Sequence, residues 1–487
     1  MIILAACLVT AITAPGPKLS YSYMLWDWTR TAGNYDAFTE RVDQCREAGM
    51  DTIDLTVAWK QIEPERGRFD FSEIDRRVEY IAKAGLKTRL RLNVSYAHGW
   101  PDWFPAALMT GAGGATPTDV LSPFSPGAAD AWARAAEALS AHLGDRVDCY
   151  MPGFGMHMEV KYGDWISYER PAVSSFRSWL KTRYRTAVAL NKAWGSGFSG
   201  FEAVQPPAVP ADLSEAPQSV IDFIQFREDQ LAYVTDRFIQ GFRKGYPKAK
   251  VAVQMGESFR KESAMMSNLA YYRYARLADE VVHSYDFFVH PPDAPHNAFE
   301  SVRTFAGITG KPVIVEFDGP VLQSSFGYND DHLAALAREC IRAGASGIHV
   351  SNYSDSDPRP LGFIRAIAEM TRKAPAKQPT AESLFYVSKW TFYCMSKDET
   401  AHQRVYAYYR KLLAAGEKMR IITDENLTEP GLGRGGKLFV SWSPIVSREA
   451  FQQLKELMRE MPTETDRTEE HTTELHSRPP TSYAVFC

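Results

Sequence analysis

The sequence is poor in the patterns that build metal sites, disulfide scaffolds and nucleotide pockets. Its 487 residues include six cysteines, which lie far apart and form neither a C-x-x-C pair nor a cluster with histidine. A glycine-rich phosphate loop, H-E-x-x-H and G-x-S-x-G are missing as well. These absences argue against zinc, nucleotide and serine-hydrolase chemistry, so the sequence predicts no metal and no cofactor.

Net charge and long apolar runs are also scarce. A formal net charge of −4 offers no basic face for nucleic acid or an anionic membrane. The apolar opening, residues 1–17, is too short to cross a bilayer. It has the length of a signal or leader segment but lacks initial Lys or Arg, so export and a mis-called N-terminus both stay open, with export slightly favoured over a cytoplasmic location. We expect a neutral small molecule or polymer as partner, with no nucleic acid and no membrane.

Short apolar runs alternate with amphipathic segments from residue 18 to residue 372. This alternation is typical of βα units around a parallel sheet, and eight such units form a barrel. The sequence therefore predicts an α/β fold, a (β/α)8 TIM barrel, with an insertion at about 162–207. The predicted strands are 21–26, 52–59, 87–93, 147–159, 250–255, 281–290, 312–316 and 347–351.

The C-terminal part of the sequence changes character twice. Residues 373–380 read as a linker from their Pro, Ala and Lys content. Residues 381–462 predict a small α/β domain that looks truncated, because too few strands are visible for a doubly wound sheet. Residues 463–487 lack periodicity, and E-E-H-T-T-E-L-H-S-R-P looks like a translated sequencing adaptor, so we expect a disordered and artefactual tail.

Two acids follow apolar runs at predicted strand ends. Glu316 closes the run Pro312, Val313, Ile314 and Val315, and Glu159 ends the stretch that begins at Val147. In an α/β barrel the carboxyl ends of the strands build the active-site face. Two carboxyl groups held ~5 to 5.5 Å apart can break a glycosidic bond with retention, one attacking the anomeric carbon and one protonating the leaving oxygen.

Two longer segments carry a family resemblance. Trp59 to Asp75, W-K-Q-I-E-P-E-R-G-R-F-D-F-S-E-I-D, and Ser175 to Gly195, S-F-R-S-W-L-K-T-R-Y-R-T-A-V-A-L-N-K-A-W-G, resemble glycoside hydrolase clan A, most closely family 42 β-galactosidases and related trimeric β-glycosidases. The resemblance implies a retaining, exo-acting enzyme with Glu159 as acid/base and Glu316 as nucleophile. It also implies a carbohydrate substrate, a homotrimer and a flavodoxin- or amidotransferase-like second domain.

One position departs from the clan pattern. The clan carries Asn directly before the acid/base, where it contacts the sugar 2-hydroxyl, and this chain has Met158. Either Asn93, His157 or Asn352 takes over that contact, or the sugar differs, as in a β-mannosidase. The segment G-M-H-M-E-V-K-Y-G also resembles the inverting β-amylases. A non-catalytic carbohydrate-binding barrel is the alternative from another class.

Further polar and aromatic residues stand at predicted strand ends or in the loop after the third strand. Each is a candidate for sugar contact and, equally, for a hydrogen bond or packing contact within the loops. The candidate substrate-binding residues are Asp27, Trp59, Asn93, Trp100, Trp103, His157, Gln254, Glu257, His290 and Asn352.

Overall fold

The computed structural model describes most of the chain between residues 18 and 484. The described residues are 18–23, 35–112, 118–208, 217–256, 267, 269–284, 296–318, 323, 327–351, 362, 364–368, 383–394, 399–432, 435–466 and 483–484. The predicted leader and linker therefore lie outside the described residues.

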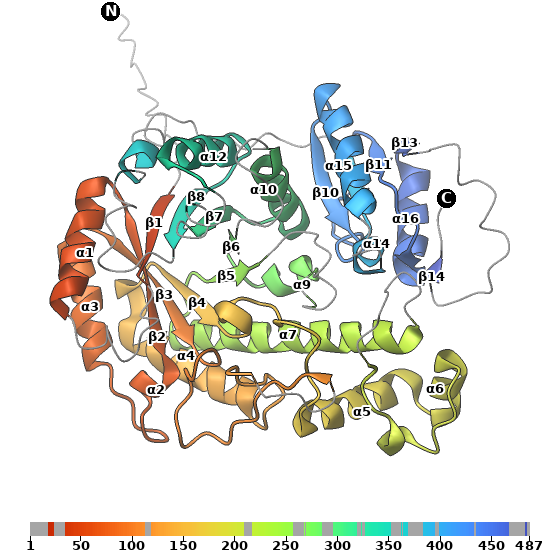
Figure 1. Cartoon of the computed structure of the whole chain (residues 1–487), viewed down its shortest axis with the longest axis horizontal. Coiled ribbons are helices and arrows are strands. Elements are labelled where there is room, and N and C mark those ends of the chain that lie inside the picture. Colours follow the sequence, from red (N-terminus) through yellow and green to blue (C-terminus); the bar gives the residue numbers. More distant parts are fainter. Residues whose placement is uncertain are drawn as a thin grey trace, which may run out of the picture.

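Eight parallel strands form a closed barrel (Figure 1). The strand order is β4-β3-β2-β1-β8-β7-β6-β5, and a parallel bridge between Tyr150 and Val251 joins β4 to β5. The predicted (β/α)8 fold is confirmed. The strands are β1 Lys18–Tyr23, β2 Thr52–Ala58, β3 Lys87–Asn93, β4 Cys149–Gly153, β5 Ala252–Met255, β6 Glu280–Ser284, β7 Val313–Asp318 and β8 Gly347–Ser351.

Helices cover the outside of the barrel. In α3, Ile74, Val78 and Ile81 recur at helical spacing and are all buried, and the chain leaves the helix through Gly85 at φ +78°. Helices α1 and α12 bury an apolar face in the same way. The helices that accompany the barrel strands are α1 Tyr35–Ala48, α2 Trp59–Ile62, α3 Ser72–Lys83, α4 Ala128–Leu143, α7 Gln218–Gly245, α9 Tyr271–Ala275, α10 His296–Thr309 and α12 Asp330–Arg342.

The predicted insertion forms a small helical lobe beside the barrel. It contains α5 Arg170–Tyr184 and α6 Ala187–Trp194, which begins at the Thr186 cap and ends at Gly195. The long helix α7 runs from this lobe along the barrel and beneath the second domain (Figure 1). It therefore connects all three parts of the molecule.

The second domain has a four-stranded parallel sheet in the order β10-β9-β11-β13. The sequence predicted only β10 and β11 there, because β9 is a five-residue run directly after the linker. The elements are β9 Ser383–Val387, α14 Lys389–Cys394, α15 Glu399–Ala414, β10 Met419–Thr423, β11 Leu438–Val440, β12 Val446–Ser447, α16 Arg448–Glu460, β13 Thr463–Thr465 and β14 Tyr483–Ala484.

The predicted start of the disordered tail needs correction. Thr463–Thr465 form β13, which pairs with Leu438–Val440 of β11, and Tyr483–Ala484 pair with β12. The sheet thus continues past residue 462, because all three residues of β13 pair with β11 at the edge of the sheet. Within the described residues, no helix is both long and apolar enough to cross a bilayer.

Candidate active site

Glu316 and Glu159 reach the same end of the barrel by different routes. Glu316 is part of β7, in register with Ser284 of β6 and His349 of β8. Glu159 lies beyond the end of β4, after the short turn Met156–Met158, and not at the strand end itself. The Val160 amide donates to the Gln254 carbonyl at 2.9 Å, which ties this segment to β5.

Gly155 explains how the chain turns back toward the barrel before Glu159. Its φ is +80°, and a Cβ there would come within 2.4 Å of the Glu159 carbonyl and 2.5 Å of the Lys161 carbonyl. Any side chain would therefore displace the backbone that presents the carboxylate. His157 and Met158 also have positive φ, 57° and 62°, so this turn is unusually contorted for residues other than glycine.

The two carboxylates share two hydrogen-bond partners. Ser284 Oγ lies 2.7 Å from Glu159 Oε1 and 2.6 Å from Glu316 Oε2. Gln254 Nε2 donates to the same two carboxylates, at 3.2 Å and 2.5 Å. The two oxygens can therefore lie no further apart than the sum of the two serine distances. That limit falls within the ~5 to 5.5 Å typical of retaining glycosidases and below the ~6.5 to 9.5 Å of inverting ones.

Two cations compensate the two buried anions. Lys161 Nζ lies 2.7 Å from Glu159 Oε2, with both side chains under a tenth exposed. Arg91 donates to the Gln254 side-chain oxygen, which fixes the amide with its nitrogen toward the carboxylates. Burial raises the pKa of Glu159, but the charge and hydrogen bond of Lys161, with a hydrogen bond from Ser284, outweigh it and leave that pKa below its usual range.

A second buried layer lies behind Glu316. His349 has Nε2 3.9 Å from Glu316 Oε1 and Nδ1 3.3 Å from Asp54 Oδ2. Burial lowers the pKa of His349 to about 3, so its ring is neutral near pH 7. Arg89 pairs with Asp54 at 3.1 Å. This layer supports the nucleophile candidate without adding a positive charge on the histidine.

The structure brings three of the predicted residues together: Glu159, Glu316 and Gln254. Four others lie outside the described residues. They are Asp27, Glu257, His290 and Asn352.

The tryptophan predictions come out differently from one another. Trp59 has no exposed surface and donates its indole N–H to Glu63 at 2.6 Å, so in this structure it anchors the loop and presents no surface for the predicted sugar contact. Its ring packs edge-on against Trp103, which is half-buried and donates to the Glu63 carbonyl at 3.0 Å. Trp100 is 9% exposed and packs against His98, 5.0 Å between ring centroids. The presence of tryptophan in a loop therefore does not by itself predict whether the ring packs inside the loop or faces a sugar.

The two polar candidates in this region take part in loop structure. The Asn93 side chain donates to the Tyr96 carbonyl at 2.9 Å and accepts from the Ser95 and Tyr96 amides. These bonds hold the turn after β3 and leave the Asn93 side chain little hydrogen-bonding capacity for a sugar hydroxyl. His157 lies edge-on to Tyr96, 5.5 Å between centroids, in the turn before Glu159.

Sequence reasoning missed four residues of the site: Arg91, Lys161, Ser284 and His349. Arg91 had a signal, because the strand K-T-R-L-R-L-N alternates arginines with leucines, which places both arginines on one face of a predicted barrel strand. Lys161, two residues after a candidate catalytic acid, was another. Ser284 and His349 give no sequence signal that separates them from ordinary strand residues. Among the described residues, no three His, Cys, Asp or Glu side chains gather as a metal site.

Comparison with known proteins identifies the family to which the chain is similar. The glycoside hydrolase family 42 model, described as β-galactosidase, matches residues 23–315, more than half of the chain. β-Galactosidase BbgII of Bifidobacterium bifidum is 25% identical over 259 residues, which cover 48% of this chain and 36% of that protein. β-Galactosidase BgaH of Haloferax lucentense is 29% identical over 216 residues, covering 42% and 32%. The chain thus spans about a third of the length of these curated relatives.

Solved structures show the same fold. A β-galactosidase from Rahnella sp. R3 superimposes with a TM-score of 0.71 at 16% identity, covering 91% of this chain and 70% of that chain. The match includes the barrel and extends into the second domain. The family match over residues 23–315 and this shared architecture agree, and the chain belongs to glycoside hydrolase family 42, the β-galactosidase family.

Proposed function

We propose that this chain is a retaining β-glycosidase that removes terminal β-galactosyl groups. The observation that carries the proposal is the shared hydroxyl of Ser284, which keeps the facing oxygens of Glu159 and Glu316 closer together than the spacing of inverting enzymes. Family membership and the printed activity of the curated relatives support galactose as the sugar.

In the first step, a Glu316 oxygen attacks the anomeric carbon. The bond to the leaving oxygen breaks, and that oxygen takes the proton of Glu159. Glu316 is then an ester and carries no charge. In the second step Glu159 takes a proton from water, the water oxygen attacks the anomeric carbon, and Glu316 leaves as a carboxylate. The sugar has been inverted twice and keeps its configuration.

Lys161 sets a condition on this cycle. Glu159 must be protonated to act as an acid, yet the ion pair with Lys161 and the bond from Ser284 favour its anion. The reactive form of the free enzyme is therefore the protonated minority, which grows as pH falls. Above the lowered pKa of Glu159, kcat/KM falls with rising pH.

β-Mannosidase is the second candidate, and Met158 is the observation that favours it. This residue is buried and stands where the clan has an asparagine for the 2-hydroxyl, whose orientation distinguishes mannose from galactose. Asn93, one residue proposed as a substitute, is occupied by loop amides. A non-catalytic binding barrel is disfavoured because it has no need for two carboxylates held around one hydroxyl.

The test is hydrolysis of nitrophenyl β-galactoside, β-mannoside, β-glucoside and β-fucoside, with the first-formed anomer followed by proton NMR. We expect the β-anomer of galactose to appear first. Preference for the mannoside would select the second candidate. First appearance of the α-anomer would contradict retention, and no turnover by folded protein would favour the binding barrel. Homotrimer formation and export remain predictions, which light scattering and fractionation of the native host would test.

A further inference from the structure

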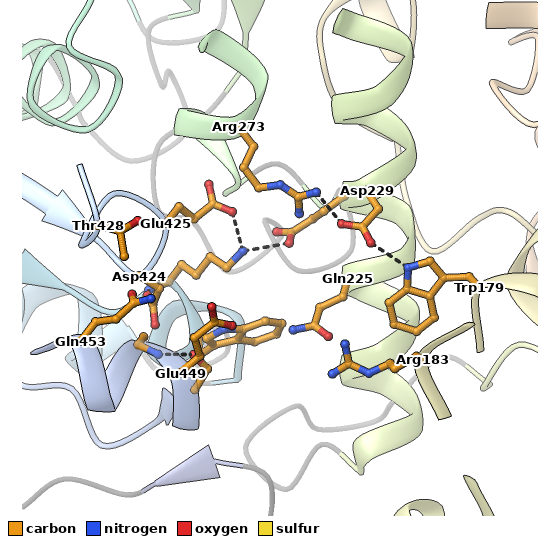
Figure 2. Close-up of a pocket in the computed structure, with 15 residues that line it drawn as sticks. Trp179, Arg183, Gln225, Asp229, Arg273, Asp424, Glu425, Thr428, Glu449 and Gln453 are labelled. Atoms are coloured by element: carbon orange, nitrogen blue, oxygen red, sulfur yellow. Dashed lines mark hydrogen bonds and ion pairs between the residues drawn. The ribbon is translucent and has the colours of Figure 1, made fainter. Parts of the chain in front are cut away.

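Two lysines are buried in the part of the chain that the structure describes, and each is paired with a buried acid. Lys389 Nζ lies 2.9 Å from Glu228 of α7 and 2.9 Å from Glu425 of the small domain. These three residues line the pocket between the two parts of the chain that Figure 2 shows, so their charges join one part to the other. Lys161 differs from Lys389, because its partner is Glu159, the residue proposed as the acid/base.

The backbone holds Lys161 against Glu159. The Met156 amide donates to the Lys161 carbonyl at 3.2 Å, and the Lys161 amide donates to the Glu159 carbonyl at 2.7 Å. The side chains form an ion pair, with Nζ 2.7 Å from Oε2. Gly256, the residue after β5, covers this pair, because a Cβ there would come within 2.3 Å of Glu159 Oε2 and 2.7 Å of Lys161 Nζ. The fold therefore encloses the ion pair between the turn and the end of β5.

Each oxygen of Glu159 faces a group that can only donate. Gln254 Nε2 donates to Oε1 at 3.2 Å. Arg91 donates to the side-chain oxygen of Gln254, and since a guanidinium cannot accept, the amide cannot turn its oxygen toward Glu159 instead. The Lys161 ammonium at Oε2 is also a donor without an acceptor. A proton on Oε1 would compete with the N–H of Gln254, and a proton on Oε2 would cost the ion pair.

The charged and titratable groups around Glu159 favour its anion as a set. They are Lys161 and His157 in the same turn, Arg91 on β3, His283 on β6 and Glu316 on β7. Glu316 is the anion among them, and it faces Glu159 across a shared hydroxyl, whereas Lys161 is in direct contact. Coulombic energy falls with distance, so the attraction to Lys161 exceeds the repulsion from Glu316.

An ionised Glu159 affects the two steps of the proposed reaction differently. In the first step it has no proton to give, so the bond to the anomeric carbon breaks with its electron pair on the leaving oxygen, which departs as an anion. In the second step the carboxylate is ready to take a proton from water as the water oxygen attacks and Glu316 leaves. Glu159 then releases that proton to solvent, which balances the anion released in the first step.

The first step therefore depends strongly on the group that leaves. A phenol has a pKa of about 10, like the tyrosine side chain, and electron-withdrawing groups lower that value. Such a hydroxyl departs as an anion without a proton from the enzyme. A sugar or alkyl hydroxyl is a far weaker acid and needs the proton, which only the minority of protonated Glu159 supplies.

We propose, on the basis of the proposed function, that Lys161 makes this enzyme selective for β-galactosides of acidic hydroxyls, aryl galactosides above all, over lactose and alkyl galactosides. Aromatic surface lies next to the acid/base, on the side where the leaving group departs. Half-buried Tyr96 and exposed His157 pack edge-on in and beside the turn before Glu159, 5.5 Å between ring centroids. An aryl leaving group can pack against these rings.

The experiment measures kcat/KM near neutral pH for dinitrophenyl, nitrophenyl, phenyl and methyl β-galactoside and for lactose. Wild type is compared with Lys161→Met and with Lys244→Met, which replaces an exposed lysine of α7 that pairs with Glu137. We expect wild-type kcat/KM to fall steeply along the series. In Lys161→Met, Glu159 holds its proton, and general acid catalysis contributes about 10²- to 10⁴-fold. The preference for the dinitrophenyl over the methyl galactoside should therefore shrink about 10²-fold or more, and stay unchanged in Lys244→Met.

A wild-type kcat/KM for methyl galactoside or lactose within about tenfold of that for nitrophenyl galactoside would overturn the proposal, and this result needs no folded variant. The same series in wild type and a folded Lys161→Met would overturn it as well. In both cases turnover with retention would leave the proposed function standing. A steep series on the matching mannosides, with no galactoside cleaved, would refute galactose as the sugar and support the role of Lys161. No turnover of any glycoside by folded protein would overturn both.

Discussion

Gln254 is the residue whose replacement tests the geometry of the carboxylate pair most sharply. Its amide nitrogen donates to both Glu159 and Glu316, and its oxygen accepts from Arg91. Gln254→Leu keeps the approximate volume and removes these three bonds together with the amide's bond to Ser284 Oγ. The two carboxylates then face each other across Ser284 with less compensation, and like charges at this spacing disfavour double ionisation.

The expected size of the effect follows from the lost bonds. Hydrogen bonds to charged groups contribute about 1.5 to 3 kcal/mol each, so two of them correspond to about 3 to 6 kcal/mol if both are fully expressed in the transition state. At about 1.4 kcal/mol per factor of ten, kcat/KM for a nitrophenyl β-galactoside should fall about 10²- to 10⁴-fold.

The assay compares Gln254→Leu with Gln44→Leu, a glutamine on α1 that bonds only to Glu40 among the interactions described. Thermal unfolding of both proteins separates catalytic loss from loss of fold. The alkaline limb of the kcat/KM–pH profile should also shift to higher pH in Gln254→Leu. Without the amide donor the two carboxylates hold a shared proton more tightly. Activity within about threefold of wild type, in a protein that unfolds at the wild-type temperature, would refute the reasoning.

Three further predictions concern neighbouring residues. Lys161→Met should move the alkaline limb of kcat/KM to higher pH, because the loss of the lysine charge raises the pKa of Glu159. Lys161→Arg keeps the charge and should leave the limb in place. Equal shifts in both variants would contradict this role of Lys161. Ser284→Ala should lower kcat about ten- to hundredfold with little change in the unfolding midpoint, and an unchanged kcat would count against it. Trp59→Phe should lower the free energy of unfolding in urea by about 2 to 4 kcal/mol, because it loses the bond to Glu63. KM should be unchanged, and a raised KM would support the predicted sugar contact of Trp59.

The barrel could be predicted because short, largely apolar runs alternate with amphipathic segments at the spacing of βα units, even where single charged residues interrupt a strand. The strands 87–93 and 347–351 were predicted at the bounds the structure shows. β9 and β13 escaped prediction because they are short and stand next to a linker and a polar tail. Their pairing partners, not their own composition, make them strands.

The candidate site could be predicted only in part. Glu316 and Glu159 were predicted because each ends an apolar run. The turn through Gly155, which separates Glu159 from β4, could not be predicted because it depends on contacts with β5. The role of Trp59 could not be predicted, because whether an indole faces solvent or a buried Glu63 depends on how two loops pack. Ser284 is an ordinary residue until β6 and β7 place it between two carboxylates.

The most direct test of the central claim is the hydrolysis of nitrophenyl β-galactoside by Glu316→Ala with and without azide. The alanine leaves space where the carboxylate would attack, and azide can enter it and react at the anomeric carbon. The account predicts that turnover is lost in the variant and restored by azide, with α-galactosyl azide as the product. Wild-type activity in Glu316→Ala, or a β-configured azide product, would contradict the assignment of Glu316 as the nucleophile of a retaining enzyme.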